Sequence, residues 1–340
     1  MKVLLWILTL GLASLVACSG GDRQAGQADA ADTTRLRIED LNRLIAQDQG
    51  NADLLNQRAR YFLVDRQLDK ALQDVHKAIT IDGNRPAYYI TLSEIYLLMG
   101  LPDQARDALL SSLSRNPDDT DVLVRLAKVY LIVQDYAKCY ETIDRALAAD
   151  NSCSPAYYTR AISLLEQGDT LKAVSDLKKA VDINQSYYEA YVQLGELYAM
   201  KKDPAAELYF QHALSQWPTS REALYNLGLF YQETGRYEKA IQTYQSLSKT
   251  DSTSREAWYN TGYIYLVYLN DYPKAVEFFS GAIRLDPAYH EAWYNRGYGY
   301  ELQGDYTSAA EDYHQALKVK VNYDKAIEGL NRLDRIRMGR

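Results

Sequence analysis

The sequence has few of the residue types that build chemical sites. Its 340 residues include 3 cysteines and 4 histidines, and no two histidines have the spacing of metal ligands on one helix face. Its 18 glycines form no phosphate-binding loop after a strand, and no serine lies in a nucleophile-elbow motif. We therefore predict no metal, no cofactor, no nucleotide site and no enzymatic activity.

The cysteines are too few for a disulfide framework. If the segment between Cys139 and Cys153 contains about ten helical residues at roughly 1.5 Å each, plus a turn, the two thiols are too far apart to pair. Cys139 takes the place of an alanine that recurs elsewhere in the chain, so we interpret it as a small core residue. Cys153 lies in a predicted turn.

The charge balance is mildly acidic. The chain has 38 Lys and Arg against 45 Asp and Glu, a formal net charge of -7. Cleavage of the N-terminal segment discussed next removes Lys2 and no acidic residue, which makes the balance more negative. Nucleic acid is therefore not an expected partner.

The N-terminus has the pattern of a targeting segment. Lys2 precedes an apolar run, Val3 to Val16, that is too short to span a bilayer comfortably, and Leu15-Val16-Ala17-Cys18 closes it. This tetrapeptide resembles the signal of bacterial lipoproteins, which implies that residues 1–17 are removed and that the Cys18 thiol is acylated. An ordinary secretory signal with a chance cysteine is the alternative. Two or more acyl chains, palmitate among them, would anchor the chain to a membrane.

Residues 18–34 are predicted to be a flexible tether, because they are rich in Gly, Gln, Ala and Asp and have no apolar period. Ser19 follows Cys18, where an aspartate tends to retain enteric lipoproteins at the inner membrane. By this resemblance we expect a lipid-anchored protein of the bacterial cell envelope, at the outer membrane rather than the inner one.

The rest of the chain repeats itself at intervals of 33 to 35 residues. An alanine-like position recurs at Ala71, Ala105, Cys139, Ala173, Ala206, Ala240, Ala275 and Ala309. A second small position precedes it, at Ala59, Ser93, Ala127, Ala161, Gly195, Gly228, Gly262 and Gly297. Two helices approach closely only where neither carries a large side chain. Between the small positions lies a bulky residue expected to fill the remaining space: Phe62, Tyr96, Tyr130, Leu164, Tyr198, Tyr231, Tyr265 and Tyr300.

Turn and capping signals separate the repeats. Pro117, Pro218 and Pro287 stand where a helix must stop. Capping-box spacing occurs near several helix starts, which explains the glutamates there without a functional role. These pairs are Ser186 with Glu189, Thr219 with Glu222, and Thr253 with Glu256.

This pattern resembles the tetratricopeptide repeat, whose consensus has Trp, Leu-Gly and Tyr in its first helix and Ala, an aromatic residue, Ala and Pro afterwards. The last two repeats match most fully: Trp258, Gly262, Tyr265, Ala275, Phe279, Ala282 and Pro287, then Trp293, Gly297, Tyr300, Ala309, Tyr313 and Ala316. The first and third are weaker, with Leu55 and Leu123 at the tryptophan position. The resemblance covers residues 52–323 and implies an all-α, right-handed superhelical solenoid of eight helix hairpins.

Both ends of such a stack need a cap, because a terminal hairpin would otherwise expose an apolar face. We predict an N-terminal capping helix in residues 35–51 and a C-terminal one in residues 324–340. Their apolar residues are Leu41, Leu44 and Ile45, and Ile327, Leu330, Leu333 and Ile336. The basic residues Arg332, Arg335, Arg337 and Arg340 are interpreted as the solvated surface of the second cap rather than as a binding patch.

In this family, positions 5, 9 and 12 of the first helices line a concave groove. Here they carry Tyr158, Ile162, Leu165, Tyr225, Leu229, Tyr259, Tyr263, Leu266, Tyr294 and Tyr298. Asn226, Asn260 and Asn295 follow three of these tyrosines, and in the family such an amide can hydrogen-bond the backbone of an extended peptide. Alternatively, Tyr-Asn is simply the consensus of this repeat. Tyrosine or valine replaces the position-5 lysine that chaperone-binding members use.

The groove residues favour a protein partner, bound as an extended peptide or a helix, and hence a membrane-anchored scaffold or adaptor in the assembly of a cell-envelope complex. A glycan-binding module of polysaccharide export or cell-wall machinery is the alternative, since tyrosine rings also stack on sugars. A glycan site usually gathers amide or acidic groups around one ring. The tyrosines here extend over several repeats, which favours the peptide.

Overall fold

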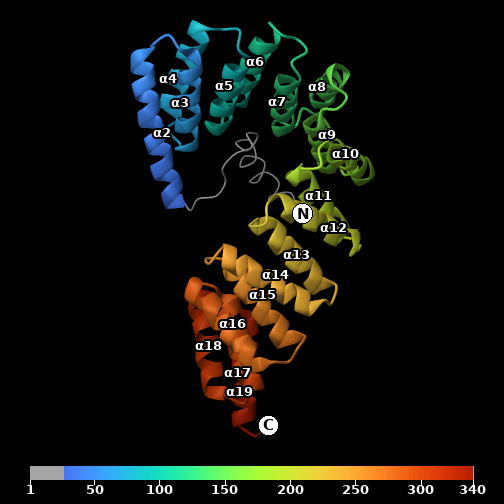
Figure 1. The fold of residues 1–340 in the computed structure, drawn as a ribbon. Coiled ribbons are helices and arrows are strands. Elements are labelled where there is room, and N and C mark those ends of the chain that lie inside the picture. Colours follow the sequence, from blue (N-terminus) through green and yellow to red (C-terminus); the bar gives the residue numbers. More distant parts are fainter. Residues whose placement is uncertain (1–26, 340) are drawn as a thin grey trace. The chain divides into compact units, whose positions relative to one another are not determined.

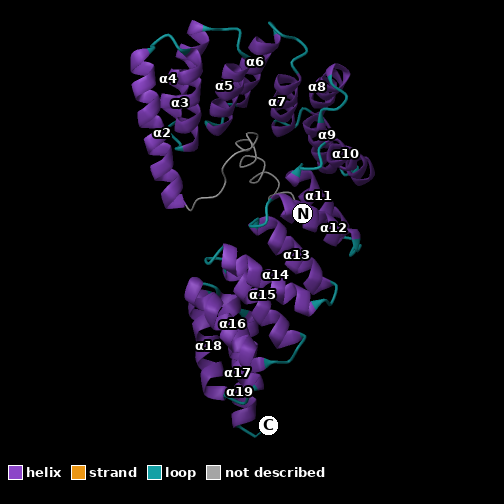
Figure 2. Cartoon of the chain, in the orientation of Figure 1, coloured by secondary structure: helices purple, strands orange, loops and turns teal. Residues whose placement is uncertain are grey.

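The computed structural model describes residues 27–339, and its regular elements there are 18 α-helices joined by short loops (Figures 1 and 2). No strand occurs in that range. The predicted signal in residues 1–17, the acylation site Cys18 and the first part of the predicted tether lie outside the described residues.

Sixteen of the helices form eight antiparallel hairpins, one for each predicted repeat. In chain order the hairpins are α3 (Ala52–Val64) with α4 (Leu68–Ile81), α5 (Pro86–Leu98) with α6 (Pro102–Leu113), α7 (Thr120–Ile132) with α8 (Tyr136–Ala149), α9 (Ser154–Glu166) with α10 (Thr170–Ile183), α11 (Tyr188–Ala199) with α12 (Ala205–Gln216), α13 (Arg221–Glu233) with α14 (Tyr237–Thr250), α15 (Arg255–Val267) with α16 (Tyr272–Leu285), and α17 (His290–Leu302) with α18 (Tyr306–Val319). The all-α solenoid fold of eight hairpins is confirmed.

The helices form two compact units, divided after Asn184. We call residues up to Asn184 the N-terminal unit and residues from Gln185 the C-terminal unit. Within each unit every helix packs against the next one along the chain, and some first helices of successive hairpins also touch, such as α7 with α9 and α15 with α17. Each hairpin therefore shares its core with its neighbours in the unit, as expected for a stack of repeats.

The turn inside a hairpin is set by two local preferences. Its first part holds a residue with positive φ, which is glycine in several hairpins, such as Gly168 at 84° and Gly304 at 80°. In four hairpins an aspartate then caps the second helix. The side chains of Asp169 and Asp305, for example, accept hydrogen bonds from the backbone N–H groups of Lys172 and Ser308. These signals end one helix and begin the next within a few residues.

The small positions pack as predicted. All eight alanine-like residues, Cys139 included, are fully buried. In the C-terminal unit the other small position is glycine, and a ring from the second helix lies against it. A Cβ atom on Gly195 would come within 2.6 Å of the Phe210 ring, and one on Gly228 within 2.6 Å of the Tyr244 ring. The two helices of a hairpin are thus close enough for the ring of the second helix to contact the backbone of the first helix.

The bulky position between the small ones differs from the prediction. Phe62, Tyr130 and Tyr231 are buried, but the other five are only half-buried. The rings of the second helices already fill the space next to the small residues. The aromatic at this position therefore covers the edge of the hairpin, as Tyr265 does by stacking on Phe278 at 5.5 Å.

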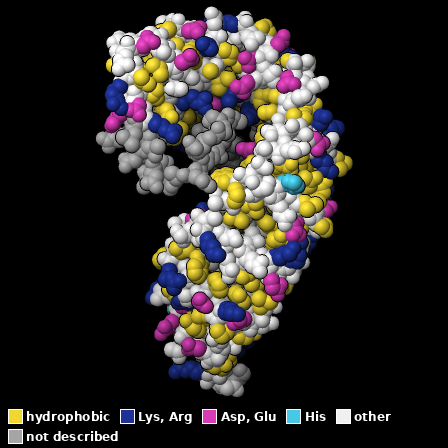
Figure 3. Space-filling model, viewed as in Figure 1, with side chains coloured by type: hydrophobic (Ala, Val, Ile, Leu, Met, Phe, Trp, Pro, Cys, Tyr) yellow, Lys and Arg dark blue, Asp and Glu magenta, His cyan; other side chains and the backbone are white. Residues whose placement is uncertain are grey.

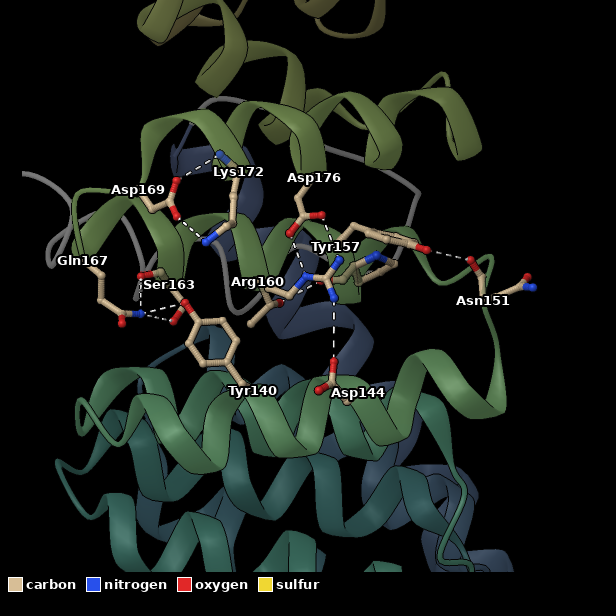
Figure 4. A network of polar contacts seen from close by, with 12 residues as sticks. Tyr140, Asp144, Asn151, Tyr157, Arg160, Ser163, Gln167, Asp169, Lys172 and Asp176 are labelled. Atoms are coloured by element: carbon tan, nitrogen blue, oxygen red, sulfur yellow. Dashed lines mark hydrogen bonds and ion pairs between the residues drawn. The ribbon is translucent and has the colours of Figure 1, made fainter.

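A buried arginine–aspartate pair ties the two helices of three hairpins together. Arg160 of α9 makes two hydrogen bonds to Asp176 of α10, at 2.7 and 2.9 Å, and lies 3.7 Å from Asp144 of α8 (Figure 4). The other two pairs are Arg58 with Asp74 and Arg296 with Asp312. Burying two charges costs free energy, so such pairs fix the relative position of the helices more than they stabilise the fold.

The two remaining cysteines have the environment expected of unpaired thiols. Cys139 and Cys153 are both buried and free, so the prediction that they do not pair is confirmed. Burial raises the pKa of the Cys139 thiol to about 11, which keeps it protonated and unreactive near neutral pH. Cys153 precedes the first residue of α9 and packs in the core shared by α7 and α9.

Both capping helices exist, but their boundaries or buried faces differ from the predictions. The first, α2, spans Gln27–Gln47, so helix replaces the second half of the predicted tether. The prediction relied on apolar periodicity, whereas alanine-rich sequence favours helix without it. Leu41 and Ile45 are buried as predicted, whereas Leu44 is exposed, because a helix at the end of a stack buries only one stripe.

The second cap, α19 (Asp324–Arg337), uses small residues as well as Leu333 for its contact. Ala326 is fully buried, and a Cβ atom on Gly329 would come within 2.6 Å of the Tyr313 ring. Ile327 and Ile336, which were predicted to face the stack, are exposed. The hydrophobic spacing alone did not reveal that the ring of Tyr313 needs a small partner here.

Gly228→Ala tests the contact between ring and backbone. Alanine normally stabilises an exposed helix position relative to glycine by roughly 1 kcal/mol. Here the added methyl group would overlap the fully buried Tyr244, so we expect a loss of about 1–3 kcal/mol in the free energy of unfolding. Urea denaturation measures it. Gly50→Ala is the control, since a Cβ atom there meets nothing closer than 3.6 Å. Unchanged or increased stability of Gly228→Ala would contradict this packing.

Candidate functional site

The predicted groove residues lie on first helices, as expected, but they are divided between the two units. Tyr158, Ile162 and Leu165 belong to α9 in the N-terminal unit, and the others lie on α13, α15 and α17 of the C-terminal unit. We call the five tyrosines of the C-terminal unit the tyrosine face: Tyr225, Tyr259, Tyr263, Tyr294 and Tyr298. All five are half-buried. On the side of the molecule drawn in Figure 3, hydrophobic side chains, tyrosine included, alternate with charged ones over this unit.

The tyrosines at position 5 point toward the second helix of their own hairpin. Ring centroids are 6.4 Å apart for Tyr225 and Tyr244, 5.5 Å for Tyr259 and Phe279, and 5.6 Å for Tyr294 and Tyr313. Burial raises the pKa of the Tyr259 and Tyr294 hydroxyls above the usual value of tyrosine. The inner half of the tyrosine face is therefore also part of the hairpin core.

The tyrosines at position 9 form an outer layer on the first. Tyr263 stacks on Tyr259 at 6.4 Å, and Tyr298 stacks on Tyr294 at 6.3 Å with an interplanar angle of 4°. These pairs follow from helix geometry, because residues four apart lie on the same side of a helix. Rings held on both sides keep few rotamers, so a ligand would order little by binding them.

Two further rings join the face from the turns between hairpins, and the sequence reasoning missed them. Tyr289, just before α17, lies 4.8 Å from Tyr259, and Tyr323, just before α19, lies 5.7 Å from Tyr294. Both immediately precede a first helix or its equivalent, and they are 34 residues apart. That recurrence at the repeat interval was the signal available in the sequence.

Each of the three asparagines beside these tyrosines has a hydrogen-bond partner within the fold. The Asn226 amide donates to Glu196 Oε1 at 2.7 Å. Asn295 is 8% exposed and donates to the Tyr259 hydroxyl at 2.8 Å, and Asn260 is hydrogen-bonded to Tyr244. Each amide thus fixes a neighbouring residue from another helix. A direct contact between these amides and a ligand stays a prediction, and it would require them to share or exchange these bonds.

A pair of glutamates, Glu196 and Glu222, lies close to the tyrosine face. Glu196 of α11 contacts Asn226, which directly follows Tyr225, and Glu222 of α13 accepts a hydrogen bond from the Tyr188 hydroxyl at 3.3 Å. Within residues 27–339 no lysine, arginine or histidine forms an ion pair with either carboxylate. Burial, together with the charge of Glu222, raises the pKa of Glu196 to about 7. Burial also raises the pKa of Glu222.

Glu222 corrects the capping-box prediction. The N-cap of α13 is Ser220, whose hydroxyl accepts a hydrogen bond from the backbone N–H group of Ala223. The Thr219 hydroxyl instead accepts a hydrogen bond from the indole N–H group of Trp217. The capping residue is therefore one position later than predicted, which frees the Glu222 carboxylate to turn toward α11. α15 likewise begins after Ser254, and α11 after Tyr187, rather than at the predicted Thr253 and Ser186.

Arg332 corrects the interpretation of the C-terminal basic residues. Its guanidinium makes two hydrogen bonds of 2.9 Å to Glu301 of α17 and lies 5.5 Å from the ring centre of Tyr298. It is half-buried rather than solvated. The other two described arginines of the tail, Arg335 and Arg337, are exposed as expected. The capping helix thus places one cation against the tyrosine face.

Neither a metal centre nor a membrane segment is found in the described part of the chain. From residue 27 to residue 339, no cluster of His, Cys, Asp or Glu has the arrangement needed to hold a metal ion. No helix in that range is both long and apolar enough to cross a bilayer.

Comparison with protein families gives one consistent result. Models described as "Tetratricopeptide repeat" match residues 86–119, 158–213, 204–260, 256–289 and 290–323. Together these ranges cover more than half of the 340 residues. They include α13, α15 and α17, which carry the tyrosine face.

Individual relatives are distant. The chain is 29% identical to human protein O-mannosyl-transferase TMTC3 over 54% of its own length and 20% of the relative's, and 25% identical to bovine BBSome complex member BBS4 over 61% and 40%. It therefore spans less than half of either protein. The C-terminal part of a repeat-containing protein from Cytophaga hutchinsonii has a similar fold, with a TM-score of 0.61 at 17% identity, covering 70% of this chain and 98% of that one.

Glu196→Gln tests whether the negative charge of the Glu196 carboxylate is buried without a cation to neutralise it. Because the pKa of Glu196 in the folded state, about 7, is above the usual glutamate value of 4.5, the folded state holds the proton more tightly and loses stability as pH rises from about 4.5 through 7. Thermal unfolding should show the variant gaining stability relative to wild type between pH 5 and pH 8. Glu238→Gln, at an exposed position of α14, is the control. A pH-independent difference between Glu196→Gln and wild type would contradict the assignment.

Proposed function

Because the chain belongs to the tetratricopeptide-repeat family, we propose that the tyrosine face of its C-terminal unit binds an extended segment of a protein partner. The observation that carries this proposal is the two-layered arrangement of rings on α15 and α17. Rigid aromatic side chains give a large contact area at low entropic cost, and their hydroxyls can hydrogen-bond a peptide backbone. The face extends over three consecutive hairpins, which suits a strand better than a compact ligand.

We further propose that the chain works as a scaffold or adaptor, held at a membrane through lipid on Cys18, in the assembly of a cell-envelope complex. A solenoid of hairpins can present one face to a partner while its other surfaces contact further subunits. The relative named as a BBSome complex member is itself part of an assembly, which is consistent with a scaffold role. The outer membrane is the proposed location, on the strength of the residues around Cys18.

The packing of the rings disfavours the glycan alternative. Sugar binding needs an open ring face, whereas Tyr259 has the rings of Tyr263, Phe279 and Tyr289 around it. Tyr294 is likewise surrounded by three rings. The outer rings of Tyr263 and Tyr298 are half-buried, and their exposed parts suit the backbone and side chains of a peptide.

Position-specific photocrosslinking tests the binding face. With the photoreactive p-benzoylphenylalanine in place of Tyr263, we expect a protein partner to be crosslinked in cells of the source organism, with the crosslink mapped to one continuous segment by mass spectrometry. The same residue in place of Tyr306 is the control, since Tyr306 is an exposed tyrosine on a second helix, α18. Equal crosslinking from both positions, or none from Tyr263, would exclude the tyrosine face as the binding site.

Once a segment is mapped, the contribution of the outer rings can be measured directly. Tyr263→Ala should weaken binding of the synthetic segment by on the order of tenfold, because a buried aromatic contact is worth about 1–2 kcal/mol. The hairpin core should survive, since Phe279 and Tyr259 still pack against each other. Fluorescence anisotropy measures the affinity, and circular dichroism checks the helix content. Unchanged affinity would show that the outer ring makes no contact.

Cys18→Ser tests the anchor separately. We expect wild-type protein to incorporate labelled palmitate and to sediment with membranes, and the variant to do neither, because hydroxyl replaces the acylated thiol. Cys153→Ser is the matched control, since that cysteine is buried in the fold. Persistent sedimentation of Cys18→Ser with membranes would count against lipidation without affecting the groove proposal.

A further inference from the structure

We propose that the segment bound on the tyrosine face carries a basic side chain, arginine or lysine, which forms an ion pair with Glu196 and Glu222. This inference rests on the proposed function and adds the chemistry of the partner. Glu196 accepts a hydrogen bond from Asn226, the residue after Tyr225, and Glu222 lies three residues before Tyr225 on α13. Residues three apart lie on the same side of a helix, so the negative charge where α11 meets α13 lies close to the first ring of the tyrosine face.

In the described part of the chain, no lysine, arginine or histidine pairs with these carboxylates. Glu196 and Glu222 repel each other, and Glu189 adds to the repulsion on Glu222. Their hydrogen-bond donors are neutral, namely the Asn226 and Gln193 amides on Glu196 and the Tyr188 hydroxyl on Glu222. Partly buried carboxylates without a cation cost free energy, and a basic group on a partner would remove that cost.

In the N-terminal unit, an arginine of the chain itself neutralises a glutamate at the same repeat position. Glu94 and Glu196 each directly follow the small residue of their repeat, Ser93 or Gly195. Glu94 is paired with Arg125 of the next hairpin at 2.5 Å. In the C-terminal unit Asn226 stands where Arg125 does, two residues before the small residue of its own repeat. The carboxylate is kept and the intramolecular arginine is absent.

Arg332 shows how an arginine fits against this face. Its two N–H groups bind both oxygens of Glu301, and the guanidinium carbon lies over the ring of Tyr298. The carboxylate pairs with the charge of a guanidinium through two hydrogen bonds, and the aromatic ring packs against its flat face. The binding mode that we propose for the partner's cation thus already occurs at the C-terminal end of the same tyrosine face, with a side chain of α19.

The test uses the full-length protein and two fluorescent probe peptides that differ only in charge. One is a short alanine- and proline-rich peptide with two arginines, and the other has citrulline, a neutral analogue, in place of both. We expect the arginine peptide to bind on the order of tenfold more tightly, as for a close charge pair, and its affinity to fall as salt rises. Anisotropy titrations measure both. Equal affinity for the two peptides, or binding of neither, would overturn the basic-partner inference.

Matched variants assign the effect to the two carboxylates. Glu196→Gln with Glu222→Gln should abolish the preference for arginine over citrulline and leave helix content unchanged, whereas Glu238→Gln should leave the preference intact. For wild type, affinity for the arginine peptide should rise as pH increases through about 7, where Glu196 loses its proton. A preference for arginine that survives the double substitution would place the charge recognition elsewhere and refute the assignment.

The two proposals can fail separately. If the segment crosslinked at Tyr263 contains no arginine or lysine, the tyrosine face binds protein but the partner's chemistry differs from that inferred here. If no segment is crosslinked at Tyr263 while the arginine peptide still requires Glu196 and Glu222, the acidic pair binds a cation independently of the tyrosine face. The first result overturns the further inference, and the second overturns the proposed function on which it rests.

Discussion

The close contact between a ring and a small residue inside each hairpin determines how the C-terminal unit is built. Phe210, Tyr244 and Phe279 each lie against a glycine of the preceding helix. The distances leave no room for a Cβ atom beside Phe210 and Tyr244, and the contact with Phe279 is nearly as close. Two helices this close have one relative position, because a shift along the axis would drive the ring into backbone. The same rule joins the last hairpin to its cap, where the Tyr313 ring meets both Gly297 and Gly329.

This packing also makes the candidate binding face rigid. With the first helix fixed by its glycine, position 5 faces the ring of the second helix, so Tyr259 and Tyr294 become partly buried. Position 9 then lies one helical turn further along the same side, and Tyr263 and Tyr298 stack on the inner rings. The arrangement of the face therefore follows from the core and needs no ligand to form.

The sequence was informative where one position recurs in every repeat. The alanine-like residues, the small residues before them and the order of helices follow from periodicity. A core that is repeated eight times requires the same residue types at the same positions of each repeat. The family models and the fold confirm that part. The tyrosines of the face could be assigned to first helices because they occupy fixed positions within the repeat, whereas their role in binding stays a prediction.

What the sequence could not supply depends on contacts between residues that occur only once. Leu44 is exposed because no hairpin covers that side of α2. Glu222 turns toward α11 because Ser220, one residue past the predicted cap, begins its helix. Asn295 is buried because the Tyr259 hydroxyl is within reach of its amide. In each case side-chain type and spacing were compatible with two roles, and only the three-dimensional neighbour decided between them.

Glu196 illustrates why such exceptions are informative about function. A repeat protein can satisfy a carboxylate at this position with its own arginine, as Glu94 and Arg125 show, so leaving Glu196 next to Glu222 sacrifices stability that the fold could have had. Residues that lower stability usually persist where binding or catalysis requires them. Because the free energy lost in the unbound protein is recovered when a cation neutralises the pair, the affinity for a basic partner grows with the cost of burying the charge. The same feature that weakens the isolated C-terminal unit would therefore select its partner.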